Sequence, residues 1–271
     1  MDVVSLARQT DLMFTRFDGE VLDRGDYLVI RTPANPGYHW GNFILFDAPP
    51  SESDFKKWCD TFRREFPFYS PLRHMTMTWN EITAEGGVFD SFLKAGFVLD
   101  KAKVLTAQAV MKPSKFNSAL TVQRLETEAQ WEAAIQLQVA CRDSKYPEKG
   151  YEIFKRRQFQ VYRAMAAAGM GSWFGAFLQN QLVGDLGVFY TGDLGRFQNV
   201  GTHPQYRRQG ICGTLVYHAA QIAFEEFGVT NLLMEADADY HAAAIYESVG
   251  FKPTEENRSL SWQQEVEGRK G

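Results

Sequence analysis

The chain has 271 residues, enough for one to two domains, and its 45% hydrophobic and 14% aromatic content excludes a largely disordered protein. With 29 basic and 33 acidic side chains, its net charge of −4 gives no overall electrostatic reason to bind nucleic acid or an anionic membrane. Three separated cysteines without a Cys-x-x-Cys pair argue against a zinc site and suit a reducing compartment. No leader and no apolar span is recognisable, so we expect a soluble cytoplasmic protein.

The first part of the chain predicts short strands that alternate with helices. β-branched and aromatic residues favour strands, and apolar residues at helical spacing behind an acidic first turn favour helices. We expect strands at residues 27–32, 41–47, 74–79 and 103–111, and helices at residues 55–66 and 88–95. Pro113 to Ser118 has the composition of a linker, so we expect two domains, residues 1–116 and residues 117–271.

The second part predicts the order β-α-α-β-β-β-α-β-α-β. We expect strands at residues 120–125, 172–178, 182–190, 196–202 and 231–236, with one or two closing strands after the last helix. We expect helices from residue 127, and at residues 152–168, 209–227 and 240–249. Turn residues separate the three strands between 172 and 202, which predicts antiparallel pairing.

One segment suits the binding of a diphosphate. Residues 203–213, His-Pro-Gln-Tyr-Arg-Arg-Gln-Gly-Ile-Cys-Gly, lead from a strand into a helix. A helix N-terminus presents unpaired N–H groups and partial positive charge, and Arg207 and Arg208 add to that charge. Gly210 and Gly213 let another group approach the backbone closely. From these residues alone, a glycine-containing turn with two solvated arginines is an equally good interpretation, and neither a Walker A loop nor a Rossmann fingerprint is present.

A second segment, residues 237–251, predicts a short helix with small residues on one face. Gly250 ends this helix, as a glycine after a helix commonly does. By itself, Tyr246 in the helix is equally well interpreted as a half-buried aromatic residue whose hydroxyl group finds a polar partner.

Together, in this order, the two segments resemble the GNAT family of acyl-CoA-dependent N-acyltransferases over residues 119–262. Arg207-x-x-Gly210-x-Cys212 matches the family's diphosphate loop. Ala242-x-x-x-Tyr246-x-x-x-Gly250-Phe251 matches its second motif. Two positions depart from the family pattern. Cys212 replaces the usual glycine or alanine but is still small, and Asp239 stands where asparagine is usual, which weakens the expected side-chain contact with the cofactor.

The resemblance implies an α/β (α+β) fold with two GNAT-like domains, each a mixed, mostly antiparallel central sheet flanked by helices. Phe92-x-x-x-Gly96-Phe97 repeats the form of the Tyr246 motif, so we interpret residues 1–116 as a diverged internal copy. This copy has no Arg-x-x-Gly loop, and its phenylalanine lacks the tyrosine hydroxyl group. Chance recurrence of the pattern at a helix end is the alternative interpretation.

The chemistry that the resemblance implies is direct attack of a primary amine on the thioester of acetyl-CoA. It assigns Tyr246 as the general acid that protonates the departing thiolate. It also implies a cofactor-binding set, which comprises Val200, Gly201, Thr202, Arg207, Arg208, Gln209, Gly210, Ile211, Cys212, Gly213, Thr214, Asp239 and Ala242. No metal is expected.

The general base is less well defined, because the strand at residues 196–202 carries no carboxylate. Glu235 and Asp237 at the end of the next strand are the candidates, in competition with a role in helix capping or simple solvation. His203 is a weaker candidate beside Pro204. We exclude Cys212 as a nucleophile, because no histidine adjoins it and the motif places it against the diphosphate.

The amine acceptor is not defined by the sequence and could be a small molecule or a peptide. The lysines and arginines between residues 142 and 163 could favour an acidic acceptor, although a solvated basic face explains them better. We expect a monomer or homodimer that binds neither nucleic acid nor membranes. Two alternatives stay open: a catalytically idle acyl-CoA-binding or sensor protein, and a structural protein with no cofactor.

Overall fold

The computed structural model describes residues 1–67, 73–237 and 242–264. The chain divides into two compact units, residues 1–102 with 255–271 and residues 103–254. These borders fall inside two strands, β5 (Val98–Ala107) and β11 (Lys252–Gln263), each of which contributes residues to both units. The border expected from the sequence, between residues 116 and 117, does not coincide with either of these divisions. The sequence contained no sign that most of the last strand, β11, belongs to the first unit.

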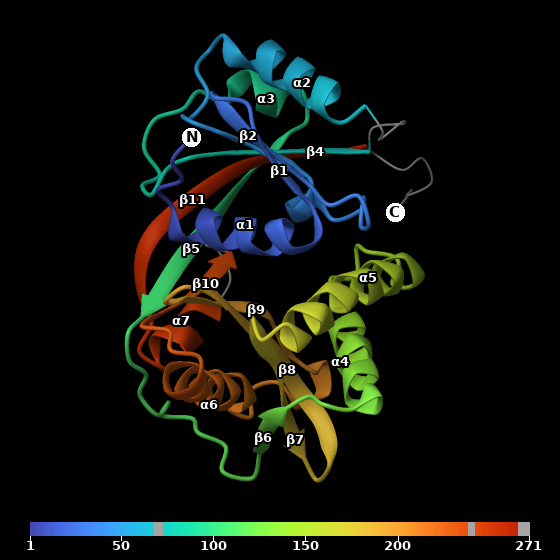
Figure 1. Ribbon diagram of the computed structural model, residues 1–271, viewed down its shortest axis with the longest axis vertical. Coiled ribbons are helices and arrows are strands. Elements are labelled where there is room, and N and C mark those ends of the chain that lie inside the picture. The colour runs from blue at the N-terminus through green and yellow to red at the C-terminus, as the bar shows by residue number, and fades with distance from the viewer. Residues whose placement is uncertain (68–72, 238–241, 265–271) are drawn as a thin grey trace. The chain divides into compact units, whose positions relative to one another are not determined.

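The first unit begins with a helix and an antiparallel meander (Figure 1). Its elements are α1 (Leu6–Asp18), β1 (Glu20–Asp23), β2 (Tyr27–Arg31), the 3₁₀ turn η1 (His39–Gly41), β3 (Phe43–Phe46), α2 (Asp54–Glu65), β4 (His74–Trp79) and α3 (Asp90–Lys94). The strand order is β1-β2-β3-β4-β11-β5. The β3–β4 pair is parallel, and the β1–β2, β2–β3 and β4–β11 pairs are antiparallel.

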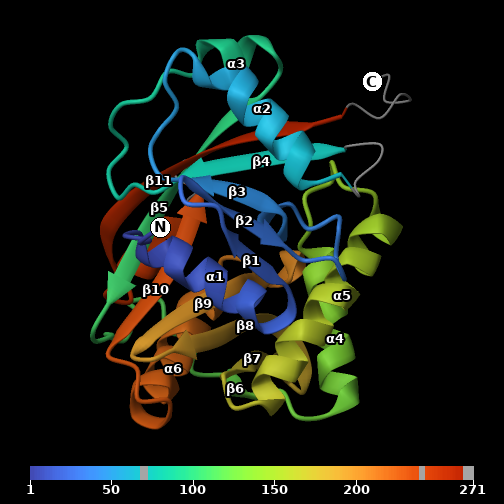
Figure 2. The same cartoon turned by 45° about the horizontal axis from the view of Figure 1, so that its top comes forward.

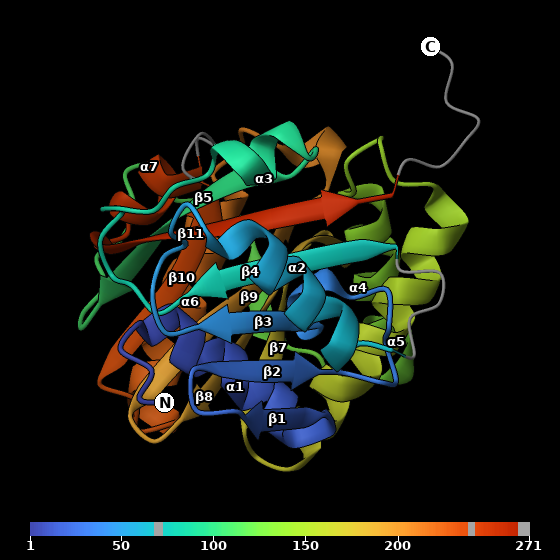
Figure 3. The same ribbon diagram turned by 90° about the horizontal axis from the view of Figure 1, so that it is seen from above.

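The two faces of this sheet carry separate cores, because side chains alternate along a strand. Ile44 shares one hydrophobic cluster with Phe62 of α2. The next residue, Leu45, shares another cluster with Leu12 of α1. Figure 3 shows α2 lying across β3 and β4, with α1 on the other side of the strands.

The second unit contains a mixed sheet in the order β5-β10-β9-β8-β7-β6. Its elements are β6 (Thr121–Arg124), α4 (Glu128–Ala140), α5 (Glu148–Ala167), β7 (Gly171–Leu178), β8 (Gln181–Thr191), β9 (Leu194–Thr202), η2 (Pro204–Tyr206), α6 (Ile211–Glu226), β10 (Asn231–Asp237) and α7 (Ala242–Glu247). β6 to β9 pair antiparallel, and β9 pairs parallel with β10. This mostly antiparallel sheet flanked by helices confirms the predicted fold class.

Helices cover both faces of the second sheet (Figures 1 and 2). Trp173 of β7 packs with Phe159 and Tyr162 of α5, with ring centroids 4.5 and 5.0 Å apart. On the other face, Val188 of β8 shares a hydrophobic cluster with Leu215 of α6. No helix among the described residues is long and apolar enough to cross a membrane.

Several predicted elements differ from the structure. The sequence did not predict α1, because its buried residues include Arg8 and Thr10, which interrupt the apolar repeat of the helix. It did not predict the four-residue β1. The predicted strand at 103–111 is β5, which begins earlier at Val98 and ends at Ala107, because its first residues are mostly exposed and lack an apolar pattern. The predicted helix at 209–227 begins at Ile211.

The two units share an order of elements. Three antiparallel strands, a helix, a parallel strand, a short helix and a final strand occur as β1-β2-β3-α2-β4-α3-β5 and again as β7-β8-β9-α6-β10-α7-β11. Gly96 and Gly250 follow the two short helices at φ +85° and +110°. This correspondence supports a diverged internal copy, which stays a prediction.

Candidate active site

The predicted diphosphate loop connects β9 to α6. Gly210 is the residue before the helix and has φ 76° and ψ 5°, a left-handed conformation that favours glycine. Arg208 also has a positive φ of 65°. Because a helix begins here, the first backbone N–H groups of α6 have no acceptor within the helix. The helix start that the sequence predicted is therefore present after Gly210, and a helix N-terminus carries partial positive charge.

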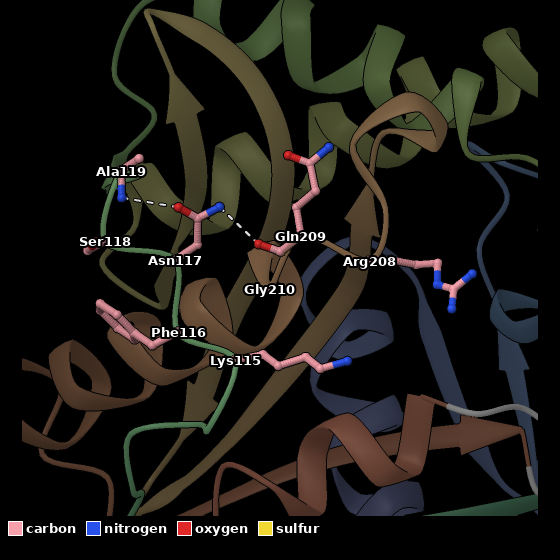
Figure 4. A pocket seen from close by; sticks show the side chains of 8 residues that line it. All are labelled: Lys115, Phe116, Asn117, Ser118, Ala119, Arg208, Gln209 and Gly210. Carbon is pink, nitrogen blue, oxygen red and sulfur yellow. Dashed lines mark hydrogen bonds between the residues drawn. The ribbon is translucent and has the colours of Figure 1, made fainter.

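A pocket of about 340 Å³ opens beside this loop. The residues that line it are Lys115, Phe116, Asn117, Ser118, Ala119, Arg208, Gln209 and Gly210. In Figure 4 the side chains of Lys115 and Arg208 extend to the same side of Gly210, whereas Phe116 points away. Within the described ranges, neither cation forms an ion pair with a carboxylate. The pocket therefore has two cationic side chains available to an anion.

The segment that completes this pocket was expected to be only a linker. Asn117 donates from its side chain to the Gln209 carbonyl oxygen at 2.9 Å, and its backbone N–H donates to the Thr214 hydroxyl oxygen at 2.8 Å. Sequence reasoning missed Lys115, because contacts between residues more than 90 positions apart leave no local pattern. The one sequence feature that could have indicated this role was a lysine in a polar segment to which no other function had been assigned.

The space left by the missing side chain of Gly210 is filled by another segment of the same chain. A Cβ at this position would overlap the Lys115 carbonyl oxygen, and a Cβ at Gly213 would contact Pro113 at 3.4 Å. At Gly210, the sequence interpretation that the glycine admits a ligand therefore has a second explanation, because Gly210 allows residues 113–117 to pack on the first turn of α6. The distance at Gly213 is an ordinary van der Waals contact, so this packing does not require glycine there.

Several other residues of the predicted cofactor-binding set make contacts within the protein itself. Ile211 is 1% exposed and Thr214 is also 1% exposed, so their side chains are not available to a ligand. Burial raises the pKa of the Cys212 thiol to about 12, which keeps it protonated at neutral pH and agrees with its exclusion as a nucleophile. The Arg207 side chain donates to the Thr202 carbonyl oxygen at 3.4 Å.

β9 and β10 are paired over only part of their length. The parallel register runs from Leu194 opposite Asn231 to Arg196 opposite Leu233. β9 then continues to Thr202 and β10 to Asp237 without further paired residues in the described chain. The peptide groups of Val200, Gly201 and Thr202 on the β10 side are therefore outside a β-ladder.

Of the predicted acid and bases, Tyr246 lies in α7, Glu235 and Asp237 lie near the C-terminal end of β10, and His203 lies between β9 and η2. Tyr246 is 7% exposed and belongs to the same hydrophobic cluster as the α6 residues. Glu235 accepts a hydrogen bond from Arg196 at 3.0 Å, with the two side chains 15% and 9% exposed. Asp237 is exposed at the end of β10, and His203 packs against Tyr206 with ring centroids 5.6 Å apart.

Two residues of the predicted set cannot be placed fully. Asp239 lies outside the described residues, and Ala242 is the first residue of α7. Elsewhere in the described chain, no group of three or more His, Cys, Asp or Glu side chains is arranged to hold a metal ion.

Comparisons with known proteins agree with this fold. Residues 131–251 match the family model described as the acetyltransferase (GNAT) family. No curated protein matches the sequence significantly. Among solved structures, a functionally unknown conserved protein from Staphylococcus epidermidis has a TM-score of 0.74 at 12% identity, over 91% of this chain and 95% of that one.

Two further similar structures are described as GCN5-related N-acetyltransferase (GNAT) proteins. A GCN5-related N-acetyltransferase from Kribbella flavida has a TM-score of 0.66 at 16% identity, over 96% of each chain. A tandem GNAT protein from the clavulanic acid biosynthesis pathway has a TM-score of 0.55 at 13% identity, over 95% of this chain and 91% of that one. At these identities, the similarity shows the fold alone.

The match to the acetyltransferase (GNAT) family model over residues 131–251, with a fold similar to that of a GCN5-related N-acetyltransferase, confirms the resemblance to this family that the sequence predicted.

Proposed function

We propose that this protein transfers an acetyl group from acetyl-CoA to a primary amine. The observation that carries the proposal is the position of the pocket with two cations. It lies at the start of α6, in the loop that follows β9, and β9 is the strand that separates from β10 after Arg196. A helix start suits a diphosphate, and a strand with unpaired peptide groups suits an acyl carbonyl group.

The residues around the pocket fit the diphosphate of coenzyme A. Backbone N–H groups between Arg208 and Gly213 supply oriented donors, and the Lys115 and Arg208 side chains supply charge. Residues 113–117 cover one side of the first turn of α6, so the diphosphate would approach from the side on which these two cations extend.

The remaining groups suit the transfer step. Acetyl-CoA, when bound, supplies an acyl carbon activated as a thioester. Peptide N–H groups near Val200 to Thr202 would donate to the carbonyl oxygen as negative charge develops there, an effect worth roughly 3 kcal/mol for one donor in comparable sites. Tyr246 would donate its hydroxyl proton to the departing sulfur. A tyrosine pKa of about 10 is compatible with protonating a thiolate whose conjugate acid has a pKa of about 8.5.

The amine must lose a proton, and the candidates for this role are unequal. Glu235 is the first candidate, although its carboxylate already accepts a hydrogen bond from Arg196. Asp237 and His203 are the others, each acting directly or through water. The acceptor is a small-molecule or peptide amine, and we retain the expectations of a cytoplasmic monomer or homodimer.

The test is release of coenzyme A by the purified chain with acetyl-CoA and a broad panel of primary amines. The panel should include polyamines, aminoglycosides, amino acids and peptides with free N-termini. We expect at least one amine to release thiol faster than background hydrolysis and to gain the mass of an acetyl group. Thiol release no faster than background with every amine would contradict the proposal.

A second candidate is an acyl-CoA-binding protein without turnover. The Arg196–Glu235 ion pair favours it, because the first candidate base is already engaged. This protein would bind acetyl-CoA tightly in calorimetry and acetylate no amine in the panel. Acetylation that depends on the Tyr246 hydroxyl group would exclude it.

A further inference from the structure

A cluster of mostly buried polar side chains lies between helices α4 and α5 and strands β8 and β9. Its members are Gln138 of α4, Lys155, Gln158 and Tyr162 of α5, Asp185 of β8 and the half-buried Asn199 of β9; Lys155 Nζ donates to Gln158 Oε1 at 2.9 Å. Asp185 is 0% exposed, Tyr162 is 2% exposed, and the two glutamines are each 5% exposed. Burying so many polar groups in a core costs free energy unless all are hydrogen-bonded. A cluster of this kind therefore suggests a specific structural or functional role.

The cluster surrounds a bulge in β9. Asp185 pairs with Gly201, and Gly187 pairs with Gln198, so one residue of β8 faces the two residues Asn199 and Val200. Asn199 has φ 49°, a left-handed conformation that asparagine tolerates better than most residues. A bulge leaves its extra residue outside the ladder and changes the direction of the neighbouring peptide groups.

Hydrogen bonds hold Asn199 from two sides. Its side-chain nitrogen Nδ2 donates to Oε1 of Gln158 at 3.0 Å and to the hydroxyl oxygen of Tyr162 at 3.2 Å. Its backbone carbonyl oxygen accepts from Nε2 of Gln138 at 2.7 Å. Both the side chain and the peptide group of the bulge residue are therefore fixed to helices rather than to a neighbouring strand.

The Gln138 amide is itself anchored. Its Nε2 also donates to Oδ1 of Asp185 at 2.7 Å, and Oδ2 of Asp185 accepts from Trp173 Nε1 at 3.0 Å. A Cβ on Gly201 would lie 2.8 Å from Gln138 Nε2 and 2.9 Å from Asp185 Oδ1. Gly201, predicted as a cofactor-binding residue, therefore also gives this network the space it needs.

We infer that Asn199 and Gln158, with Gln138 on the carbonyl side, are positioning residues that fix the β9 bulge so that its peptide N–H groups bind the acyl carbonyl oxygen. The inference rests on the proposed function. Hydrogen-bond donors stabilise a developing charge most when they do not have to reorganise, and a bulge outside both ladders would otherwise be free to move. None of these side chains needs to contact the substrate.

The test is the infrared carbonyl stretch of acetyl-CoA labelled with heavy carbon at the thioester carbonyl, bound to the intact chain. We expect binding to wild type to lower the stretching frequency. Asn199→Gly tolerates the positive φ and removes both side-chain hydrogen bonds. Gln158→Met removes the acceptor, whereas Gln158→Glu retains it. The exposed Gln160→Ala on the same helix is the control.

We expect Asn199→Gly and Gln158→Met to lose at least half of the frequency shift, with the Kd for acetyl-CoA changed by no more than about twofold, because neither residue lines the pocket beside Gly210. Gln158→Glu and Gln160→Ala should keep the shift. A full shift in all variants, or bound acetyl-CoA with no shift in wild type, would overturn the inference and leave acetyl-CoA binding intact. Failure of wild type to bind acetyl-CoA would overturn the proposed function and the inference together.

Discussion

Gly210 and Lys115 are packed so closely that a Cβ on Gly210 would overlap the Lys115 carbonyl oxygen. The φ of 76° at Gly210 independently disfavours any side chain. The glycine of the predicted diphosphate loop is thus required by the chain's own packing, whatever ligand the loop binds. A change at Gly210 consequently tests the folding of the loop as well as its binding.

The first prediction compares two glycines. Gly210→Ala should destabilise the protein by about 3 kcal/mol or more, from left-handed strain plus overlap with a backbone atom. Gly228→Ala, at φ +71° with no atom within 4 Å of the added Cβ, should cost only the strain, about 1–2 kcal/mol. Urea unfolding measures both, and equal losses would contradict the close packing of Lys115.

The second prediction concerns the two cations of the pocket. Lys115→Gln and Arg208→Gln should each raise the Kd for coenzyme A about five- to tenfold, because each removes one charge-assisted contact with a phosphate. The effect should shrink as salt is added. Calorimetry against the exposed Lys252→Gln as control provides the measurement. An unchanged Kd in both pocket variants would remove this pocket from the coenzyme A site.

The third prediction concerns the Tyr246 hydroxyl group. Tyr246→Phe should lower kcat about 100-fold or more and leave the Kd for acetyl-CoA nearly unchanged, because a general acid acts in the transfer step rather than in binding. Tyr190→Phe, which removes a hydroxyl bonded to the Gly169 carbonyl oxygen, is the matched control. If Tyr246→Phe and wild type have equal kcat values, the Tyr246 hydroxyl group is not the acid, and another group protonates the departing thiolate.

The fourth prediction concerns pH and the first unit. The rings of His39 and His74 stack with centroids 4.1 Å apart. Burial, and secondarily the charge of His74, lower the pKa of His39 from 6.5 to about 4, and burial lowers the pKa of His74. The unfolded chain binds more protons than the folded chain between these values, so the free energy of unfolding should fall as pH decreases from 6.5 toward 4.

Urea unfolding at several pH values checks this prediction. The slope is limited to about 1.4 kcal/mol per pH unit for each histidine. His39→Phe keeps a ring in the stack without a titrating group, so its stability should depend less on pH. A His39→Phe slope as steep as that of wild type would assign the acid sensitivity to other groups.

Most elements with a clear apolar or turn pattern were predicted from the sequence, whereas α1 and β1 were not. β7, β8 and β9 are separated by turn residues and were predicted to pair antiparallel, which the structure confirms. Thr127 caps the start of α4, and its side chain accepts from Gln130 N in a capping box, so a local signal marked this helix start. α1 escaped prediction because its buried Arg8 and Thr10 conceal its apolar face.

The sequence by itself indicated the resemblance to the GNAT family, the mixed α/β fold and the helix start at Gly210, because these depend on local spacing of glycine, arginine and apolar residues. Only the tertiary structure brought Lys115 to Arg208, tied Glu235 to Arg196 and set Gln138 and Gln158 around Asn199. These contacts join residues far apart in the chain, and a hydrogen bond between distant segments leaves no periodic trace in the sequence. Local motifs therefore predict the loop before α6, whereas the packing of distant segments supplies Lys115 to the pocket and the hydrogen bonds around Asn199.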